Sequence, residues 1–283
     1  MVAVVLTQGN RAAALQLAVD SLLRSGIHKV VLVWNADGVP DTETNRIASL
    51  PEVELRVAGR NLGIPGGRNF GVHYCDGDYI VFLDDDAAVH SKHLASRIRE
   101  HFITHPKCGA IAFRIVDEEN NTQRRHHPRI GKVGLNRPGK VATFAGGACA
   151  LRRTTFLEAG AFDASFIYAM EEQDLAWRIY GNYSEVHYLP DIRIFHPPSL
   201  PSRHPSYLEK TWHNRVVAAY KSLPLWIRPI YLSLHGLRTH RMGLSAGDLM
   251  RLSNIARKSV NEKFPLRPAV ILKLLRIGRP PIL

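Results

Sequence analysis

The segment YIVFLDDDAAV, residues 79–89, joins an apolar run to three adjacent aspartates, Asp84, Asp85 and Asp86. The uncharged run before the aspartates is typical of a strand buried in a sheet. Three neighbouring carboxylates repel one another, so a fold that keeps them together needs a cation beside them. Their oxygens are hard ligands that favour Mg²⁺ or Mn²⁺. The alternative interpretation is a polar turn in which an aspartate caps the next helix.

Strand and helix signals alternate along the first part of the chain. Short apolar or β-branched runs predict buried strands at VAVVLT, VVLVW, VELRV and YIVFL. Residues 10–24 have the apolar spacing of an amphipathic helix, which Gly26 is positioned to end. We expect Ser91 to cap a second helix, with Pro106 beyond its end. The repeated strand–helix order predicts a doubly wound α/β sheet that binds ligands at the carboxyl ends of its strands.

The composition is that of an ordinary globular protein, with 283 residues of which 45% are hydrophobic and 22% charged. The segment MVAVVLTQGNRAAALQ lacks a basic region before its short apolar run, which favours a first core strand over a signal peptide. No apolar stretch approaches the roughly 20 residues of a membrane-spanning helix. The three cysteines, Cys75, Cys108 and Cys149, lack metal-ligand spacing in the sequence. We expect them to be reduced packing residues of a cytoplasmic protein.

The net charge of +12 is confined to the C-terminal part of the chain. Residues 201–283 hold 15 lysines and arginines against three acids, whereas the first 200 residues hold 22 charges of each sign. This asymmetry predicts a near-neutral domain at residues 1–200 and a basic helical extension at residues 201–283, joined by the Pro-rich HPPSLPSRHP. The extension mixes bulky apolar and basic residues at helical spacing, which is typical of helices that lie on anionic membranes. A helical bundle packed on the first domain is the alternative interpretation.

Glycines and an arginine precede the aspartates in GRNLGIPGGRNFGV, residues 59–72. This composition predicts a loop whose backbone can approach a ligand closely. Arg68 would donate hydrogen bonds to a phosphate or to the acidic cluster. A dinucleotide-binding fingerprint should instead follow the first strand, where the sequence is TQGNR.

A second group of acids, Glu171, Glu172 and Asp174, begins a predicted helix that closes at Gly181. Acids at a helix N-terminus stabilise its dipole, and that alone is unremarkable. Three acids within four residues, after the Gly146–Gly147 turn, favour a division of labour between the two acidic groups. The first would hold a metal ion and a phosphate, and the second would supply a general base.

The succession NLGIPGGRN, FLDDD, GGACALRRTTFLEAGAFD and EEQDLAWR resembles glycosyltransferase family 2 over residues 2–197. The resemblance implies a GT-A fold, which is an α/β fold with a Rossmann-like, mostly parallel sheet and flanking helices. It also implies inverting transfer of a sugar from a nucleotide-diphosphate donor, with UDP- and dTDP-sugars favoured. The similarity to rhamnosyltransferase-like members implies a lipid-linked or glycan acceptor, and a small-molecule acceptor is the alternative.

The resemblance also implies roles for particular residues. Asp84 and Asp86 match the Asp-x-Asp motif, in which the first touches the ribose and the last binds Mn²⁺ or Mg²⁺. His196 falls where a histidine completes the metal site, and Glu172 matches the catalytic base. The supporting residues would be Asp174 and Arg178, and the donor-binding residues Thr7, Asn35, Asp37, Asn61, Gly66, Arg68, Asp84, Asp85, Gly146, Gly147 and Glu171.

Two residues depart from the family pattern. Trp34 stands where an aspartate often reads the nucleotide base, so Asn35 or Asp37 would have to supply those hydrogen bonds. Glu172 stands where aspartate is commoner, so the acceptor oxygen must lie farther away by one methylene group.

The sequence also bears on the acceptor site and on two other classes of protein, nucleotidyltransferases and nucleic-acid-binding proteins. The basic segment TQRRHHPRIGKVGLNRPGK, residues 122–140, would cover the acceptor or remain a solvated loop. A nucleotidyltransferase needs a Gly-rich basic loop after the first strand, which residues 9–11 do not supply. The sequence pI of about 9.9 raises the question of nucleic-acid binding. Because no zinc-finger spacing or recognition motif is present, we expect no nucleic-acid partner. We expect a cytoplasmic location, which would be at the inner face of the membrane if the extension docks there.

Overall fold

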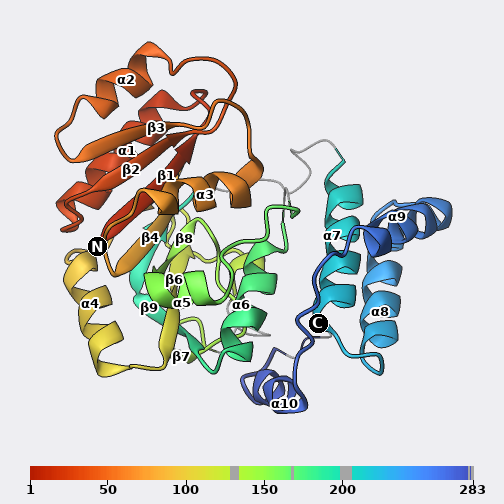
Figure 1. Cartoon of the computed structure of the whole chain (residues 1–283). Helices are drawn as coiled ribbons and strands as arrows, with labels where there is room; N and C mark the ends of the chain where they lie inside the picture. Colours follow the sequence, from red (N-terminus) through yellow and green to blue (C-terminus); the bar gives the residue numbers. More distant parts are fainter. Residues whose placement is uncertain (128–133, 167–168, 198–205, 280, 282–283) are drawn as a thin grey trace.

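The computed structural model describes residues 1–127, 134–166, 169–197, 206–279 and 281 (Figure 1). The strands are β1 (Val2–Thr7), β2 (Val30–Trp34), β3 (Val53–Val57), β4 (Tyr79–Asp84), β5 (Ala88–Val89), β6 (Cys108–Val116), β7 (Gly139–Lys140), β8 (Ala148–Arg152) and β9 (Glu185–Phe195). The helices are α1 (Ala12–Arg24), α2 (Thr42–Ala48), α3 (Gly63–His73), α4 (Leu94–Thr104), α5 (Arg153–Glu158), α6 (Glu171–Gly181), α7 (Tyr207–Ser222), α8 (Arg228–Arg241), α9 (Ala246–Lys258) and α10 (Pro268–Arg276). A 3₁₀ turn, η1, covers Arg124–His126.

The described strands form one sheet in the order β3-β2-β1-β4-β8-β6-β9-β5, with β7 paired to β9. The four predicted strand runs are β1 to β4, and they pair in parallel. Strand β8 is antiparallel to both β4 and β6, and β6 is parallel to β9. All of the longer strands except β8 therefore point the same way, so the sheet is mostly parallel as predicted. The carboxyl ends of β1, β4 and β9 consequently lie at one edge of the sheet.

Helices cover both faces of the sheet. One buried apolar cluster joins α1, α2 and α4 to one face, through residues such as Leu22, Ile47 and Ile98. The other cluster joins α3, α5 and α6 to the opposite face, through residues such as Val72, Phe156 and Trp177. The three cysteines are buried and unpaired, as expected.

The Gly-rich segment before the aspartates is a helix, so the prediction of a loop was wrong. Gly67 and Gly71 lie one helical turn apart on the side of α3 that faces the sheet. A Cβ at Gly67 would stand 2.6 Å from Leu6, and one at Gly71 would stand 2.5 Å from Val4. The glycines therefore let α3 approach the sheet closely, and this approach carries Arg68 towards the end of β4.

The helix after β5 begins later than predicted, and Ser91 does not cap it. Its N-cap residue is His93, which has a left-handed φ of 60° and provides no side-chain cap. The hydroxyl of Ser91 instead donates to the carbonyl of Asp191 at 3.0 Å and accepts from the amide of Arg193 at 2.7 Å. Ser91 therefore ties the end of β5 to β9.

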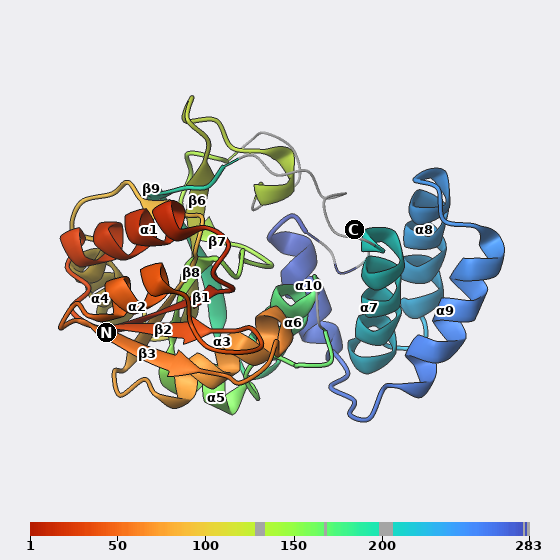
Figure 2. The same cartoon turned by 90° about the horizontal axis from the view of Figure 1, so that it is seen from above.

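The C-terminal helices form a bundle beside the sheet domain. Figures 1 and 2 show α7 lying alongside α8 and α9, and Figure 1 shows α10 below α6 and the bundle. Trp212 and Val216 of α7 belong to the same buried cluster as Trp177 of α6. The packed-bundle interpretation therefore holds for α7. The predicted boundary between the two regions falls in residues 198–205, which lie outside the described residues.

An ion-pair network buried at this junction links α7 to α6. Lys221 Nζ lies 2.6 Å from a carboxylate oxygen of Asp163 and 3.2 Å from one of Asp174. Asp174 also accepts from Arg178 Nε at 2.9 Å. Asp174 is fully buried and Lys221 is 5% exposed, so these charges depend on one another.

Within the described residues, no helix combines the length and the apolar character needed to cross a bilayer.

Replacement of Lys221 tests this junction. In Lys221→Met, Asp174 keeps only Arg178 as a cationic partner, and Asp163 loses its buried partner. We expect the free energy of unfolding to fall by about 3 kcal/mol, measured by urea denaturation. The control is Lys210→Met on the same helix, where the side chain is exposed; we expect a change within about 0.5 kcal/mol. Equal midpoints for the two variants would contradict the proposed importance of the network.

Candidate functional site

Two arginines from different elements neutralise the three aspartates at the end of β4. Arg68 of α3 donates to Asp84 at 3.0 Å. Arg11, in the turn before α1, lies 3.2 Å from Asp85 and also contacts Asp86. Burial raises the pKa of Asp85 to about 6, although the charge of Arg11 opposes that rise. The sequence analysis did not identify Arg11, and the only signal for it was its place in the turn after the first strand.

Asp84, Asp86 and His196 form a cluster of potential metal ligands, with ligand atoms within 4.8 Å of one another. Nε2 of His196 lies 3.3 Å from Asp86 and 3.9 Å from Asp84. Nδ1 of His196 donates to the carbonyl of Pro197 at 2.8 Å, so Nε2 is the ring nitrogen that faces the two carboxylates and could coordinate an ion beside them. Two carboxylates and one imidazole fit Mn²⁺, and the carboxylates also suit Mg²⁺.

Gly146 and Gly147 lie where no side chain would fit. A Cβ at Gly147 would stand 1.9 Å from a carboxylate oxygen of Asp84, and one at Gly146 would stand 2.1 Å from the guanidinium of Arg68. The amide of Gly146 donates to Oε1 of Glu172 at 3.0 Å. The carbonyl of Gly147 accepts from the amide of Asp84 at 3.2 Å. This short stretch of backbone therefore holds the aspartates on one side and Glu172 on the other.

Glu171 and Glu172 begin α6, as predicted, but their surroundings differ. Glu171 is 2% exposed, and its Oε1 lies 3.6 Å from Arg68. Burial, and then the charge of Glu172, raise the pKa of Glu171 well above its ordinary value, although Arg68 opposes the rise. Glu171 therefore favours its protonated form. Glu172 is less buried and lines the cleft described below.

The turn before α6 has an unusual backbone. Ala169 and Met170 are consecutive residues with left-handed φ angles of 65° and 75°. Such angles cost free energy in residues other than glycine and persist only where neighbouring contacts hold them. Asn214 of α7 supplies one such contact by donating to the carbonyl of Ala169 at 2.9 Å. The C-terminal extension therefore supports the turn that presents Glu172.

Asp174 and Arg178 lie behind this surface, on the buried side of α6. Arg178 pairs with Asp174 and donates to the carbonyl of Ala161 at 2.7 Å. These contacts fix α6 against the segment after α5. Neither residue lines the cleft, and their supporting role stays a prediction.

A cleft of about 440 Å³ joins the two acidic groups. The predicted residues that line it are Arg68, Asp84, Gly146, Gly147, Glu171, Glu172 and His196. The sequence analysis missed other lining residues, among them His126 and His127 from the 122–140 segment and Tyr207 and Arg279 from the extension. Of that segment, residues 128–133 lie outside the described residues. The extension therefore contributes to the lining of the cleft and also packs against α6.

The residues predicted to bind the nucleotide base lie at the ends of β1 and β2, outside the lining of that cleft. Thr7 is buried, and its hydroxyl accepts from the amide of Gly9 at 3.2 Å. The amide group of Asn35 donates to the carbonyl of Gly63 at 3.0 Å and accepts from the amide of Leu62 at 2.9 Å. Asn35 therefore fixes the start of α3.

Three further positions complete the predicted donor side. Asp37 is exposed in the turn after β2. Asn61 accepts from the amide of Gly63 at 2.8 Å, and Gly66 lies within α3. Trp34 is 6% exposed, and its ring lies so close to Gly9 that a Cβ there would stand 2.5 Å away. The indole therefore fills space behind the turn after β1.

Comparison with known sequences identifies relatives. The sequence model described as "Glycosyl transferase family 2" matches residues 3–160. A pre-mycofactocin glycosyltransferase of Mycobacterium tuberculosis is 24% identical over 258 residues, which cover 88% of this chain and 51% of that protein. An uncharacterised protein of Haemophilus influenzae is 29% identical over 106 residues, 36% of this chain and 57% of that protein. The chain thus spans about half the length of the curated relatives it matches.

Three solved structures share the fold. GalNAc-T7 with UDP, GalNAc and Mn²⁺ has a TM-score of 0.65 at 17% identity, covering 93% of this chain and 54% of that chain. Staphylococcus aureus TarS 1–349 with UDP-GlcNAc has 0.63 at 14%, covering 90% and 79%. The mannosyltransferase PcManGT from Pyrobaculum calidifontis with GDP-Man and Mn²⁺ has 0.55 at 16%, covering 99% and 76%.

These likenesses confirm the predicted mixed α/β GT-A fold, with its mostly parallel sheet and C-terminal helices. Nothing in them is specific to rhamnosyltransferases. The family match covers more than half of the chain and includes the Gly-rich helix, the three aspartates and the Gly146–Gly147 turn. The chain belongs to glycosyl transferase family 2.

Proposed function

We propose that the protein is an inverting, metal-dependent glycosyltransferase that uses a nucleotide-diphosphate sugar. The observation that carries the proposal is the pairing of two groups across Gly146 and Gly147. The potential metal ligands Asp84, Asp86 and His196 lie on one side, and Glu172 lies on the other. The complexes of structural relatives with UDP, UDP-GlcNAc and GDP-Man support a nucleotide-sugar donor. We favour a UDP- or dTDP-sugar for this chain.

The proposed reaction is a single displacement at the anomeric carbon. A divalent ion held by Asp84, Asp86 and His196 would supply Lewis-acid stabilisation of the leaving diphosphate. Glu172 accepts the proton of the acceptor hydroxyl as that oxygen attacks the opposite face of the sugar. The hydrogen bond from the amide of Gly146 orients the carboxylate for this task. Because the acceptor itself is the nucleophile, the configuration inverts and no covalent sugar–enzyme intermediate forms.

Replacement of Asp86 tests the metal dependence. The variant Asp86→Ala loses one of the two carboxylates near Nε2 of His196. We expect Mn²⁺-dependent binding of UDP, measured by calorimetry, to weaken on the order of 100-fold. The control is Asp76→Ala, which removes an exposed carboxylate before the opposite end of β4. Equal affinity of the unmodified protein for the nucleotide in Mn²⁺ and in EDTA would show that the metal role is wrong.

Replacement of Glu172 tests the base. Glu172→Gln keeps the size of the side chain and can still accept from Gly146, so donor binding should survive while the rate of transfer falls by about 10² to 10⁴. We expect a much smaller loss in Glu171→Gln, because burial already favours the neutral form of Glu171. A steady-state assay of both variants decides the assignment. If Glu171→Gln loses activity and Glu172→Gln does not, the base is Glu171.

We further propose that the C-terminal extension docks on an anionic membrane at its cytoplasmic face, where the acceptor would be a lipid-linked glycan. Trp226, Ile230, Leu234 and Leu237 are exposed at intervals of three or four residues along and just before α8, so they share one helical face. Arg238 and Arg241 are exposed near the end of the same helix. On α10, Leu272 and Leu275 are also exposed. Apolar residues flanked by basic ones suit insertion at an anionic surface.

Vesicle flotation tests this docking. The full chain should float with anionic vesicles and much less with neutral ones, because each basic residue near the surface contributes about 1 kcal/mol. Raised salt should weaken the binding. Trp226→Ala should reduce flotation several-fold, whereas Leu17→Ala, which changes another exposed apolar residue, on α1, should not. A chain that stays with the unbound fraction on both kinds of vesicle lacks the proposed membrane surface.

A second candidate acceptor is a small molecule or natural product. The observation that favours it is the relative named as a pre-mycofactocin glycosyltransferase, because that name specifies neither a lipid nor a polysaccharide. Failure of the flotation experiment, together with transfer to an unanchored acceptor, would select this candidate.

A further inference from the structure

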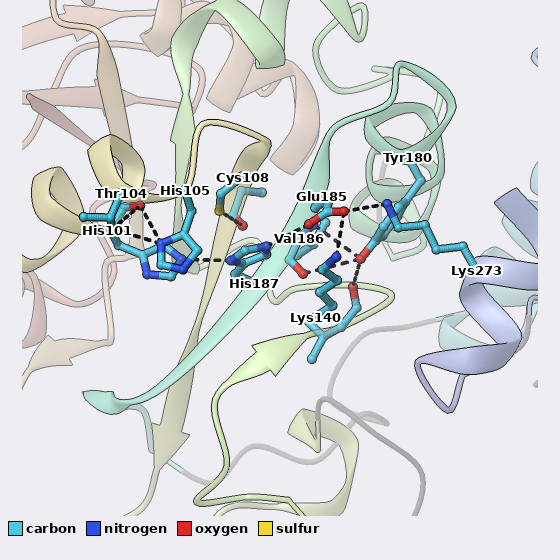
Figure 3. A network of polar contacts seen from close by, with 12 residues as sticks. His101, Thr104, His105, Cys108, Lys140, Tyr180, Glu185, Val186, His187 and Lys273 are labelled. Carbon is cyan, nitrogen blue, oxygen red and sulfur yellow. Dashed lines mark hydrogen bonds and ion pairs between the residues drawn. The ribbon is translucent and has the colours of Figure 1, made fainter.

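A second cluster of ligating side chains lies outside the lining of the cleft, towards the starts of β6 and β9 (Figure 3). His101 comes from the last turn of α4, Cys108 begins β6, and His187 lies near the start of β9. One ligand atom from each of the three side chains lies within 4.8 Å of the other two. No metal-ligand spacing is recognisable in the sequence around Cys108, because the three residues belong to three different elements.

A carboxylate fixes the tautomer of His187. Glu185 Oε2 lies 3.1 Å from Nε2 of His187, and Glu185 also accepts from Lys140 at 2.9 Å and Lys273 at 2.7 Å. An ionised carboxylate can only accept, so Nε2 of His187 carries the proton and Nδ1 is bare. A carboxylate behind the far nitrogen of a histidine is the usual second partner of a metal-binding imidazole.

The bare nitrogen of His187 points at His101. His101 Nε2 and His187 Nδ1 are 2.9 Å apart, and Figure 3 shows the two rings meeting beside Cys108. Neutral imidazole is the form that coordinates metal ions. His101 is only partly buried, so an ion has access from solvent.

We propose that His101, Cys108 and His187 bind one transition-metal ion of the Zn²⁺ class, with the fourth position left to water. Two imidazoles and a thiolate are ligands that zinc prefers, whereas Mg²⁺ and Mn²⁺ prefer the oxygen-rich cluster at the cleft. Binding replaces the hydrogen bond between the rings, as the proton of His101 moves from Nε2 to Nδ1. Cys108 releases its thiol proton to solvent, and no electron is transferred. Zinc–nitrogen bonds of about 2.0–2.1 Å require the two nitrogens to separate slightly.

The site would add metal–ligand bonds between parts of the fold that apolar packing and hydrogen bonds already join. Its ligands tie the end of α4 to the beginnings of β6 and β9. Behind His187, Glu185 continues the connection to Lys273 on α10, in the C-terminal extension. An ion bound here would therefore stabilise the sheet domain and raise its melting temperature, without contact with the reacting groups.

Cobalt titration of the full chain tests the proposal. Co²⁺ replaces Zn²⁺ in such sites, and a thiolate ligand gives a charge-transfer band in the near ultraviolet that oxygen ligands do not give. We expect this band to saturate at one Co²⁺ per chain and to disappear when Zn²⁺ is added. It should persist in Asp86→Ala, which separates it from ion binding at the cleft.

Variants distinguish coordination by Cys108 from other thiols. Cys108→Ser should abolish the band, while Cys75→Ser, which changes another buried thiol, should keep it. His101→Ala alters a partly exposed side chain, and we expect it to weaken Co²⁺ binding at least tenfold. Circular dichroism checks that each variant is folded. Absence of the band in the unmodified chain, or its persistence in folded Cys108→Ser, would overturn the proposal and leave a hydrogen-bonded histidine cluster only.

Discussion

The buried guanidinium of Arg68 is the charge on which the rest of the site depends. It lies between Asp84 and Glu171, which belong to different acidic groups, and its aromatic neighbours Phe82 and Phe162 exclude water. Burial opposes its charge, but Asp84 and Glu171 more than offset this, so its pKa stays raised. Without this cation, Asp84 would lose the guanidinium that pairs with it, and the buried carboxyl group of Glu171 would lose its cationic neighbour. The close packing of α3 on the sheet is what delivers the guanidinium to that position.

Much of the fold could be predicted from the sequence because its signals are local. The four parallel strands are uninterrupted apolar runs, and α6 begins and ends where its acids and Gly181 indicate. The Gly-rich segment was wrongly predicted to be a loop, because glycines occur both in loops and where a helix packs closely on a sheet. Ser91 misled it because the same hydroxyl can cap a helix or bridge two strands, and only the fold decides which partner lies near.

The candidate site was predictable in part for a related reason. Asp84, Asp86 and Glu172 can be recognised in the sequence because each lies in a cluster of acidic residues. The structure brings Asp84 and Glu172 to the same cleft. Arg11 and the cluster around Cys108 give no comparable signal. Each depends on contacts between residues separated by about 75 positions or more, as with Arg11 and Asp86. Such pairs are set by the tertiary fold and leave no spacing to recognise.

The hydrogen bond from Asn214 to Ala169 bears on whether the sheet domain could be separated from the C-terminal extension. All of the proposed reacting groups precede residue 197, which suggests a self-sufficient catalytic unit with a replaceable appendage. The left-handed pair at Ala169 and Met170 argues otherwise, because one of the contacts that hold it comes from the appendage. A recombination event at the junction would have to bring its own substitutes for Asn214 and Lys221. The C-terminal helices and the sheet domain therefore form one stability unit, because each supplies partners for strained or charged groups of the other.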